Sequence, residues 1–140
     1  MTSTYINIAD NRKIRFAVVG CGHIGKRHAE MIKRNPEAEL VALCDIRPEK
    51  AEAARKSIEK TPHKPDLYTS GENEWKKLCE RQDIDLIYIA TPWHLHTPMA
   101  LFAMEHGKHV AVEIPAATTV EECWQLVETS EKTRRHCMKL

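Results

Sequence analysis

Three glycines at a fixed spacing, set between an apolar run and a helical pattern, constrain this chain more than any other feature. The string Gly20-Cys21-Gly22-His23-Ile24-Gly25 directly follows residues 14–19, a short apolar run typical of a buried parallel strand. A helical pattern begins inside the string and ends at about residue 34, before Pro36. A strand, a tight glycine turn and a helix in this order indicate the start of a βαβ unit.

The same alternation continues along the rest of the chain. Further strands are expected at 40–44, 67–68, 84–90, 110–112 and 137–140, and further helices at 48–59, around 75–79, at 97–107 and after 119. Strands that alternate with helices predict an α/β fold, a doubly wound parallel sheet of the Rossmann type with helices on both faces. Residues 1–12 are interpreted as a polar arm and residues 13–140 as the folded domain.

Local signals predict where helices end and which faces they bury. Thr97 before Pro98 predicts a helix N-cap, Gly107 predicts the end of that helix, and Thr119 with Glu122 fits a capping box. The faces expected to pack on the sheet consist of Ile24, His28, Met31 and Ile32 in the first helix and Val120, Cys123, Trp124 and Val127 in the last.

Charge and hydropathy exclude several classes of partner. The chain has 21 Lys and Arg residues against 20 Asp and Glu residues, for a formal net charge of +1. Proteins that bind nucleic acid or membrane surfaces usually carry excess basic charge, so neither partner is expected. No apolar run approaches the ~20 residues that span a bilayer, and the first residues lack the order of a signal peptide. An export signal of a longer parent would lie outside this sequence.

The cysteines and histidines indicate no disulfide framework and no metal site. The five cysteines are scattered, and three of them, Cys44, Cys79 and Cys123, fall within apolar patterns. We interpret these three as core residues in a reducing compartment, which predicts a cytoplasmic location. The eight histidines are dispersed, and no pair at i, i+4 has a nearby acid.

The glycine loop and the acid that follows it predict that the cofactor is NAD. Gly20 permits a tight turn, Gly22 allows the backbone to approach a pyrophosphate, and Gly25 allows close packing of helix and strand. Asp45 ends the second strand, twenty residues beyond Gly25, where a carboxylate accepts hydrogen bonds from a ribose diol and repels a 2′-phosphate. This favours NAD over NADP, although Arg47 could tolerate NADP. The alternative for Asp45 is a loop or helix-capping acid.

Two other strand ends are expected to line the same site, because ligands of doubly wound sheets lie beyond the carboxyl ends of the strands. One is the segment from Thr91 to His96, and the other is Glu113-Ile114-Pro115. Trp93 could stack near the cofactor or simply cover the core. His96 could bind the cofactor or cap a helix, while capping is preferred for His94. A zinc site at the two histidines is disfavoured, since no third ligand is evident.

These motifs together resemble the Gfo/Idh/MocA family of glucose–fructose oxidoreductases and inositol dehydrogenases. The resemblance rests on the glycine loop, Asp45, the Thr91-Pro92-x-x-x-His96 pattern and the Gly-Lys-His-Val run at 107–110, and it covers residues 13–140. It implies further NAD contacts in addition to the glycines and Thr91. The residues implied are His23, Ile24, Asp45, Trp93, His94, Leu95, His96, Glu113 and Ile114.

One departure from the family pattern concerns its chemistry. The family usually has Glu-Lys-Pro where this chain has Glu113-Ile114-Pro115, and isoleucine cannot donate a proton. Together with Trp93 and residues 122–126 and 135–138, this is similar to the branch of NAD-dependent α-N-acetylgalactosaminidases. Residues 23–28 look more like ordinary sugar dehydrogenases. In the glycosidase branch, the resemblance implies a resident NAD that accepts a hydride from the sugar and later returns it.

The expected function is that of an NAD-binding domain from an oxidoreductase that acts on a sugar or sugar derivative, with a redox-cycling glycosidase as one form. The family's second, C-terminal substrate domain is expected to be absent, so the 140-residue chain should be inactive alone, and no catalytic residue is assigned. The sugar would bind through that domain, and apolar surface left exposed would favour a homo-oligomer. The alternatives are a stand-alone NAD-binding or sensing module and a Rossmann domain with a degenerate, empty site.

Overall fold

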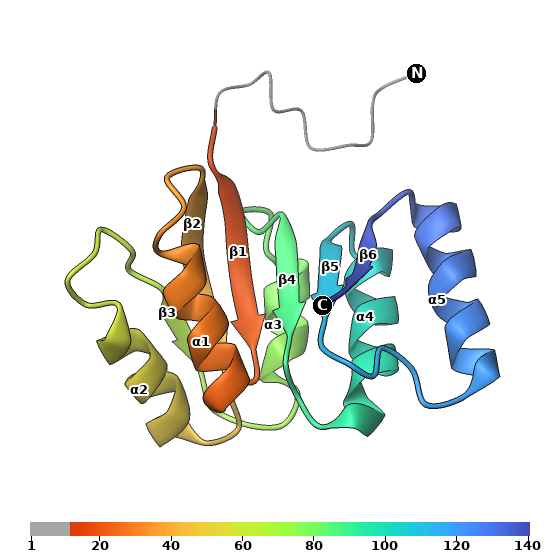
Figure 1. Ribbon diagram of the computed structural model, residues 1–140, viewed down its shortest axis with the longest axis horizontal. Coiled ribbons are helices and arrows are strands. Elements are labelled where there is room, and N and C mark those ends of the chain that lie inside the picture. Colours follow the sequence, from red (N-terminus) through yellow and green to blue (C-terminus); the bar gives the residue numbers. More distant parts are fainter. Residues whose placement is uncertain (1–11) are drawn as a thin grey trace.

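The computed structural model describes residues 12–140 as one six-stranded parallel sheet in the order β3-β2-β1-β4-β5-β6 (Figure 1). The strands are β1 (Ile14–Val19), β2 (Ala38–Cys44), β3 (Asp66–Tyr68), β4 (Leu86–Ile89), β5 (His109–Val112) and β6 (Cys137–Lys139). The helices are α1 (His23–Ile32), α2 (Pro48–Ser57), α3 (Glu74–Glu80), the short 3₁₀ helix η2 (Trp93–Leu95), α4 (His96–Glu105) and α5 (Val120–Thr133). The predicted arm at 1–12 lies outside the described residues, except for Arg12.

Helices cover both faces of the sheet, which confirms the predicted doubly wound fold. Figure 1 shows α1 and α2 in front of the sheet and α3 and α4 behind it, and α5 packs beside α4. Successive strand residues alternate between the two layers, because side chains of a strand point to opposite faces. Thus Val18 and Tyr88 belong to the buried cluster beneath α1 and α2, and Val19 and Ile89 to the cluster beneath α3 and α4.

The strand order places the crevice for a ligand. β1 lies between β2 and β4, so the chain leaves β1 toward one edge of the sheet and returns to add strands on the other side. At such a switch point the connections on the two sides diverge and leave a crevice beyond the carboxyl ends of the strands. The glycine turn after β1 and the segments after β2 and β4 therefore meet at one edge of the sheet.

The predicted buried face was wrong for α5 and partly wrong for α1. Val120 and Trp124 of α5 are 75% and 62% exposed, Cys123 is also exposed, and only Leu126 of this helix is buried. In α1, Ile32 packs against the core and His28 stacks on Tyr88, as predicted, but Ile24 and Met31 lie at the surface, and the fully buried residues are Gly25 and Ala29. Apolar periodicity therefore gave the wrong rotation for α5 and placed only half of the α1 face correctly. Cys44 and Cys79 are buried as predicted.

Helix ends follow the predicted signals with one correction. The Oγ1 of Thr119 accepts a hydrogen bond from the Glu122 amide at 3.1 Å, which confirms this half of the capping box. Gly107, with a φ of +80°, follows the C-cap of α4. However, α4 begins at His96, so Thr97 is not its N-cap. The hydroxyl of Thr97 instead donates to the carbonyl oxygen of Ala116 at 3.2 Å.

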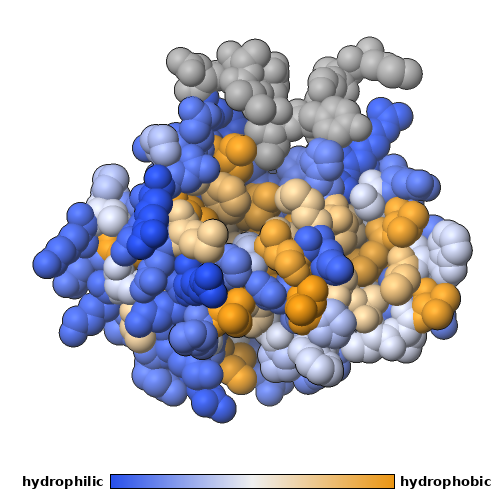
Figure 2. All heavy atoms as spheres, viewed as in Figure 1, coloured by the Kyte–Doolittle hydropathy of each residue, from blue (hydrophilic) through white to orange (hydrophobic). Residues whose placement is uncertain are grey.

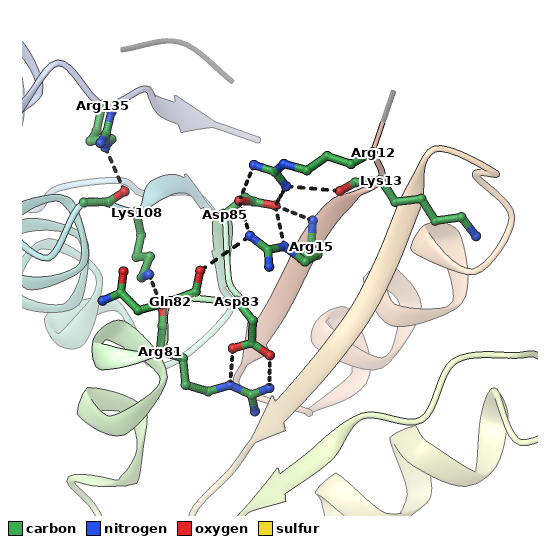
Figure 3. Close-up of polar contacts among 10 residues, drawn as sticks. Arg12, Lys13, Arg15, Arg81, Gln82, Asp83, Asp85, Lys108 and Arg135 are labelled. Carbon is green, nitrogen blue, oxygen red and sulfur yellow. Dashed lines mark hydrogen bonds and ion pairs between the residues drawn. The ribbon is translucent and has the colours of Figure 1, made fainter. Parts of the chain in front are cut away.

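An ion-pair network ties the sheet together at the amino ends of its strands, away from the crevice. Figure 3 shows Arg12 and Arg15 converging on the carboxylate of Asp85, with contacts of 2.7 and 3.1 Å. The amide of Arg15 also donates to Asp85 at 2.8 Å. Burial raises the pKa of Asp85, but the hydrogen bonds from Arg12 and Arg15 outweigh it and hold that pKa well below its ordinary value.

Hydrophobic side chains remain on the surface of this domain. Figure 2 shows them gathered on the face that Figure 1 presents, where β4, β5 and β6 have no helix in front of them. Met31, Met138 and Leu140 are 55%, 41% and 48% exposed. Among residues 12–140, the structure contains no helix with the length and hydrophobicity needed to span a membrane.

Candidate functional site

A cleft of about 710 Å³ opens at the carboxyl ends of β1, β2 and β4. It lies at the predicted switch point and has a size typical of small-molecule sites. Six of the residues predicted for the site line it, and they come from three separate segments: Gly20, Gly22, Asp45, Thr91, His94 and Leu95. The glycine turn and the acid that follows β2 therefore face the same space.

The three glycines meet different structural demands. Gly20 has a φ of +90°, and a Cβ there would lie 2.4 Å from the carbonyl oxygen of Ala90. A Cβ on Gly25 would lie 1.7 Å from the carbonyl oxygen of Gly20. Protein packing alone requires glycine at both positions. A Cβ on Gly22 would meet only the Lys50 Nζ, at 4.0 Å, so the space beside Gly22 belongs to the cleft.

The start of α1 offers hydrogen-bond donors to an anion. Gly22 is the N-cap of this helix, no side chain caps it, and its first turn carries no acidic residue. The amides of a first helical turn have no partner within the helix, and the helix dipole adds partial positive charge there. Lys50 and Arg47 from the start of α2 add positive charge to the same cleft. A diphosphate group fits this combination of open space and donors.

Asp45 is held by the backbone in an orientation that fixes both carboxylate oxygens. Its Oδ2 accepts a hydrogen bond from the Cys21 amide at 2.8 Å, and its Oδ1 accepts one from the Arg47 amide at 2.8 Å. Each carboxylate oxygen has a further lone pair that can accept from a hydroxyl group. Asp45 thus has the structural role of a loop acid that was given as its alternative, because it holds the glycine turn in place. It also keeps acceptors available in the cleft.

The segment after β4 divides its predicted site residues between the cleft and the core. Thr91, His94 and Leu95 line the cleft, whereas Trp93 is 66% exposed and is not part of its lining. His96 is 1% exposed. Its Nε2 lies 2.7 Å from the carbonyl oxygen of Thr91 and its Nδ1 lies 2.7 Å from that of Pro115. With both ring nitrogens occupied, the His96 side chain has no free group for a cofactor.

The segment after β5 places Glu113 in a polar cluster on the α1 face of the sheet. The Tyr88 hydroxyl donates to the Oε1 of Glu113 at 2.6 Å, and His28 Nε2 lies 2.8 Å from the same oxygen. The hydrogen bond from Tyr88 lowers the pKa of Glu113, while burial raises the pKa of Tyr88 well above its ordinary value. Ile114, which is 59% exposed, follows directly.

Several cleft residues were not predicted from the sequence. Asn73, Trp75 and Lys76 line it from the start of α3, and Lys50 lines it from α2. The start of α3 follows β3, so the rule of strand ends could have indicated this segment, but β3 has only 3 residues and its end is hard to recognise. His23 and Ile24, at the start of α1, are exposed and lie outside the cleft lining.

The described part of the chain contains no group of three or more His, Cys, Asp or Glu side chains placed to hold a metal ion. Asp45, Glu72 and His94 line the cleft but are not grouped to hold a metal ion, and Arg47, Lys50 and Lys76 add cationic groups there. Such a set suits a phosphorylated organic ligand better than a cation.

Comparisons with known proteins place this arrangement in a family. Two curated relatives are a glycosyl hydrolase family 109 protein from Bacteroides thetaiotaomicron, 51% identical over 128 residues, and an α-N-acetylgalactosaminidase from Bacteroides fragilis, 50% identical over 128 residues. Each alignment covers 91% of this chain but only 27% and 30% of the relative. The chain thus spans less than a third of the length of these two relatives.

Solved structures show the same fold. The WlbA dehydrogenase from Bordetella pertussis, crystallised with NADH and UDP-GlcNAcA, has a TM-score of 0.79 and 30% identity, covering 93% of this chain and 35% of that one. A putative myo-inositol dehydrogenase from Sinorhizobium meliloti has a TM-score of 0.81 and 26% identity, covering 91% and 36%. The family described as an oxidoreductase family with an NAD-binding Rossmann fold matches residues 14–139. This chain therefore belongs to the Gfo/Idh/MocA family and comprises its NAD-binding Rossmann domain.

Proposed function

We propose that this domain holds NAD for an enzyme that acts on a sugar or sugar derivative. The observation that carries this proposal is the placement of Gly22, the uncapped start of α1 and the Asp45 carboxylate around one cleft. The names of the relatives support the substrate class, since the curated ones are glycosidases and the WlbA structure contains a nucleotide sugar acid. When bound, NAD supplies a nicotinamide ring that accepts and returns hydride.

Different residues along the cleft would bind different parts of NAD. The amides of the first turn of α1 would hold the diphosphate, and Lys50 would add a cationic contact. The Asp45 carboxylate would accept from the adenosine ribose hydroxyls, and its charge would disfavour a 2′-phosphate. The segments after β4 and β5, which lie further along the sheet edge, would then border the nicotinamide end. His94, Leu95 and Ile114 are the proposed contacts there.

Within this proposal, Ile114 favours a redox-cycling glycosidase over an ordinary dehydrogenase. An isoleucine at this place offers an apolar contact and no proton, so the acid and base of the reaction must come from elsewhere. The curated relatives at about half identity carry glycosidase names, which agrees with this reading. The sugar pocket and its acid–base residues would belong to a second domain of the intact enzyme, and the length of the relatives beyond the matched region leaves room for such a domain.

Titration of NAD and NADP into the 140-residue chain tests the cofactor site. We expect NAD to bind more tightly than NADP. Asp45→Ala should lower the affinity for NAD by about 10- to 100-fold, because hydrogen bonds to a charged acceptor are lost. The same substitution should leave NADP affinity unchanged or raise it. The control is Glu52→Ala, which removes an exposed carboxylate of α2 that pairs only with Arg55. Equal affinities of the wild-type chain for the two dinucleotides would contradict the role given to Asp45.

A second assay separates the two chemistries in a protein that joins this domain to a substrate domain. Incubation with NAD and an aryl N-acetylgalactosaminide should release the aryl group without net formation of NADH if the enzyme is a redox-cycling glycosidase. Accumulation of NADH with a free sugar would instead support a dehydrogenase. A chain that binds NAD but supports neither reaction in that protein would favour a sensing or binding module.

A further inference from the structure

The segment Glu113–Pro115 is attached to the rest of the domain from both faces of the sheet. On the α1 face, the Glu113 carboxylate contacts Tyr88 and His28 at 2.6 and 2.8 Å. On the α4 face, His96 lies 2.7 Å from the Pro115 carbonyl oxygen. Between these two attachments only Ile114 projects to the surface, with 59% of it exposed. This turn is therefore held more firmly than a loop that connects a strand to a helix usually is.

His96 also reaches the segment that follows β4. Its Nε2 lies 2.7 Å from the carbonyl oxygen of Thr91, which lines the cleft. The ring thus stands between two strand ends that are neighbours in the sheet, since β4 pairs with β5. Of the described histidines, His96 is the most deeply buried, at 1% exposed. Solvent therefore cannot replace either contact.

We propose that His96 is a positioning residue, which bridges the Thr91 and Pro115 carbonyls and thereby fixes the nicotinamide end of the cleft. The proposal rests on the function given above for the cleft. Each ring nitrogen lies 2.7 Å from a carbonyl oxygen, so the ring contacts both strand ends at hydrogen-bond distance. The partial negative charges of the two carbonyl oxygens offset part of the cost of burying that ring. Thr97 strengthens the same connection through the Ala116 carbonyl oxygen.

Two substitutions of His96 separate a bridge from simple core packing. The amide nitrogen of glutamine falls near the position of Nε2, so His96→Gln can keep the Thr91 contact and loses the Pro115 contact. The amide nitrogen of asparagine falls near Nδ1, so His96→Asn can keep the Pro115 contact and loses the Thr91 contact. A residue that merely fills space would respond alike to both. His106→Gln at the C-cap of the same helix is the control, because its ring is exposed and contacts Phe102 of α4.

Amide hydrogen exchange of the chain without ligand reads out the bridge. The Glu113 amide bonds to Ile89 at 3.0 Å and the Leu95 amide bonds to Pro92 at 3.0 Å, so these two report on the two segments. We expect His96→Gln to speed exchange at Glu113 by about tenfold and His96→Asn to speed exchange at Leu95 by about tenfold, with little effect of His106→Gln. Identical profiles for the two His96 variants would overturn the proposal.

Ligand binding adds an independent test. In binding experiments, His96→Gln should lower the affinity for NAD by about tenfold. The affinity for ADP-ribose, which lacks the nicotinamide, should change by less than about twofold. Equal losses for both ligands would overturn the assignment to the nicotinamide end. If the wild-type chain binds neither ligand, the proposed function fails, while amide hydrogen exchange still decides on the bridge.

Discussion

Gly22, the N-cap of α1, and Gly25, in its first turn, lie three residues apart, yet alanine at the two positions should have different consequences. A Cβ on Gly25 would lie 1.7 Å from the Gly20 carbonyl oxygen, and that distance must grow to at least 3.0 Å. The Gly20 backbone cannot move freely, because its amide bonds to the Cys44 carbonyl oxygen at 2.8 Å. Forced repacking costs about 1–3 kcal/mol or more, against a gain of about 1 kcal/mol for alanine over glycine inside a helix. Because a fixed backbone oxygen places the clash beyond ordinary overpacking, we expect a net loss of about 2–3 kcal/mol.

Gly22→Ala meets no such obstacle, since the nearest atom to its added Cβ is the Lys50 Nζ at 4.0 Å. The loss of glycine at an N-cap should cost about 0.5–1 kcal/mol. In the cleft, however, the new methyl group occupies the space proposed for the diphosphate. NAD affinity should therefore fall by about tenfold or more, equivalent to about 1.4 kcal/mol.

Thermal unfolding followed by circular dichroism and calorimetric titration of NAD measure the two effects separately. At about 4 °C per kcal/mol for a domain of this size, Gly25→Ala should lower Tm by about 10 °C and Gly22→Ala by less than about 4 °C. A Gly25→Ala chain as stable as the wild type would refute the packing argument. A Gly22→Ala chain that binds NAD normally would refute the placement of the diphosphate.

Three other substitutions test the stability and surface of the domain. Asp85→Asn should lower the free energy of unfolding at pH 7 by about 1–3 kcal/mol. Folding depresses the pKa of Asp85, so its contribution to stability is present above pH 3.8 and is lost as the pH falls below that value. Urea titrations of the wild type and the variant should therefore converge in acid. Burial, aided by Arg135, lowers the pKa of His109 from 6.5 to about 4, so the folded chain binds a proton at His109 less readily than the unfolded chain does. Up to about 3 kcal/mol of stability should therefore be lost as the pH falls from 6.5 to 4. His109→Gln should flatten that slope, and an unchanged slope would exclude His109 as its source. Trp124→Gln removes the largest exposed side chain of α5 and should reduce the self-association measured by sedimentation velocity without lowering Tm. Unchanged self-association would mean that another surface is responsible.

Most of the fold was predictable because it depends on short-range patterns. Each strand is a brief apolar run followed by a turn signal, and the prolines, glycines and capping residues mark the helix ends within a few residues. The β6 strand at the end of the chain was also predicted, and it pairs in parallel with β5. The rotation of α5, and in part that of α1, was not predictable, because it depends on which side chains fit against the sheet.

The candidate site shows the same division between local pattern and spatial arrangement. Gly22 and Asp45 were recognisable from spacing alone, because the turn and the acid each belong to a motif with a local geometry. Lys50, Trp75 and Lys76 carry no such motif, and only the fold brings them to the cleft. His96 was predicted to contact the cofactor, whereas its burial between two carbonyl groups depends on the approach of two loops distant in sequence.

The amino-acid sequence alone determined the class of fold and the position of the glycine turn, and it predicted the acid that would favour NAD, because these depend on the order and spacing of neighbouring residues. Only the tertiary structure decided that Gly20 and Gly25 serve packing while Gly22 faces the cleft. It also decided that Glu113 is bound to His28 and Tyr88, and that His96 joins two strand ends. These contacts join residues far apart in the chain, and their geometry depends on how strands and helices pack rather than on any local pattern.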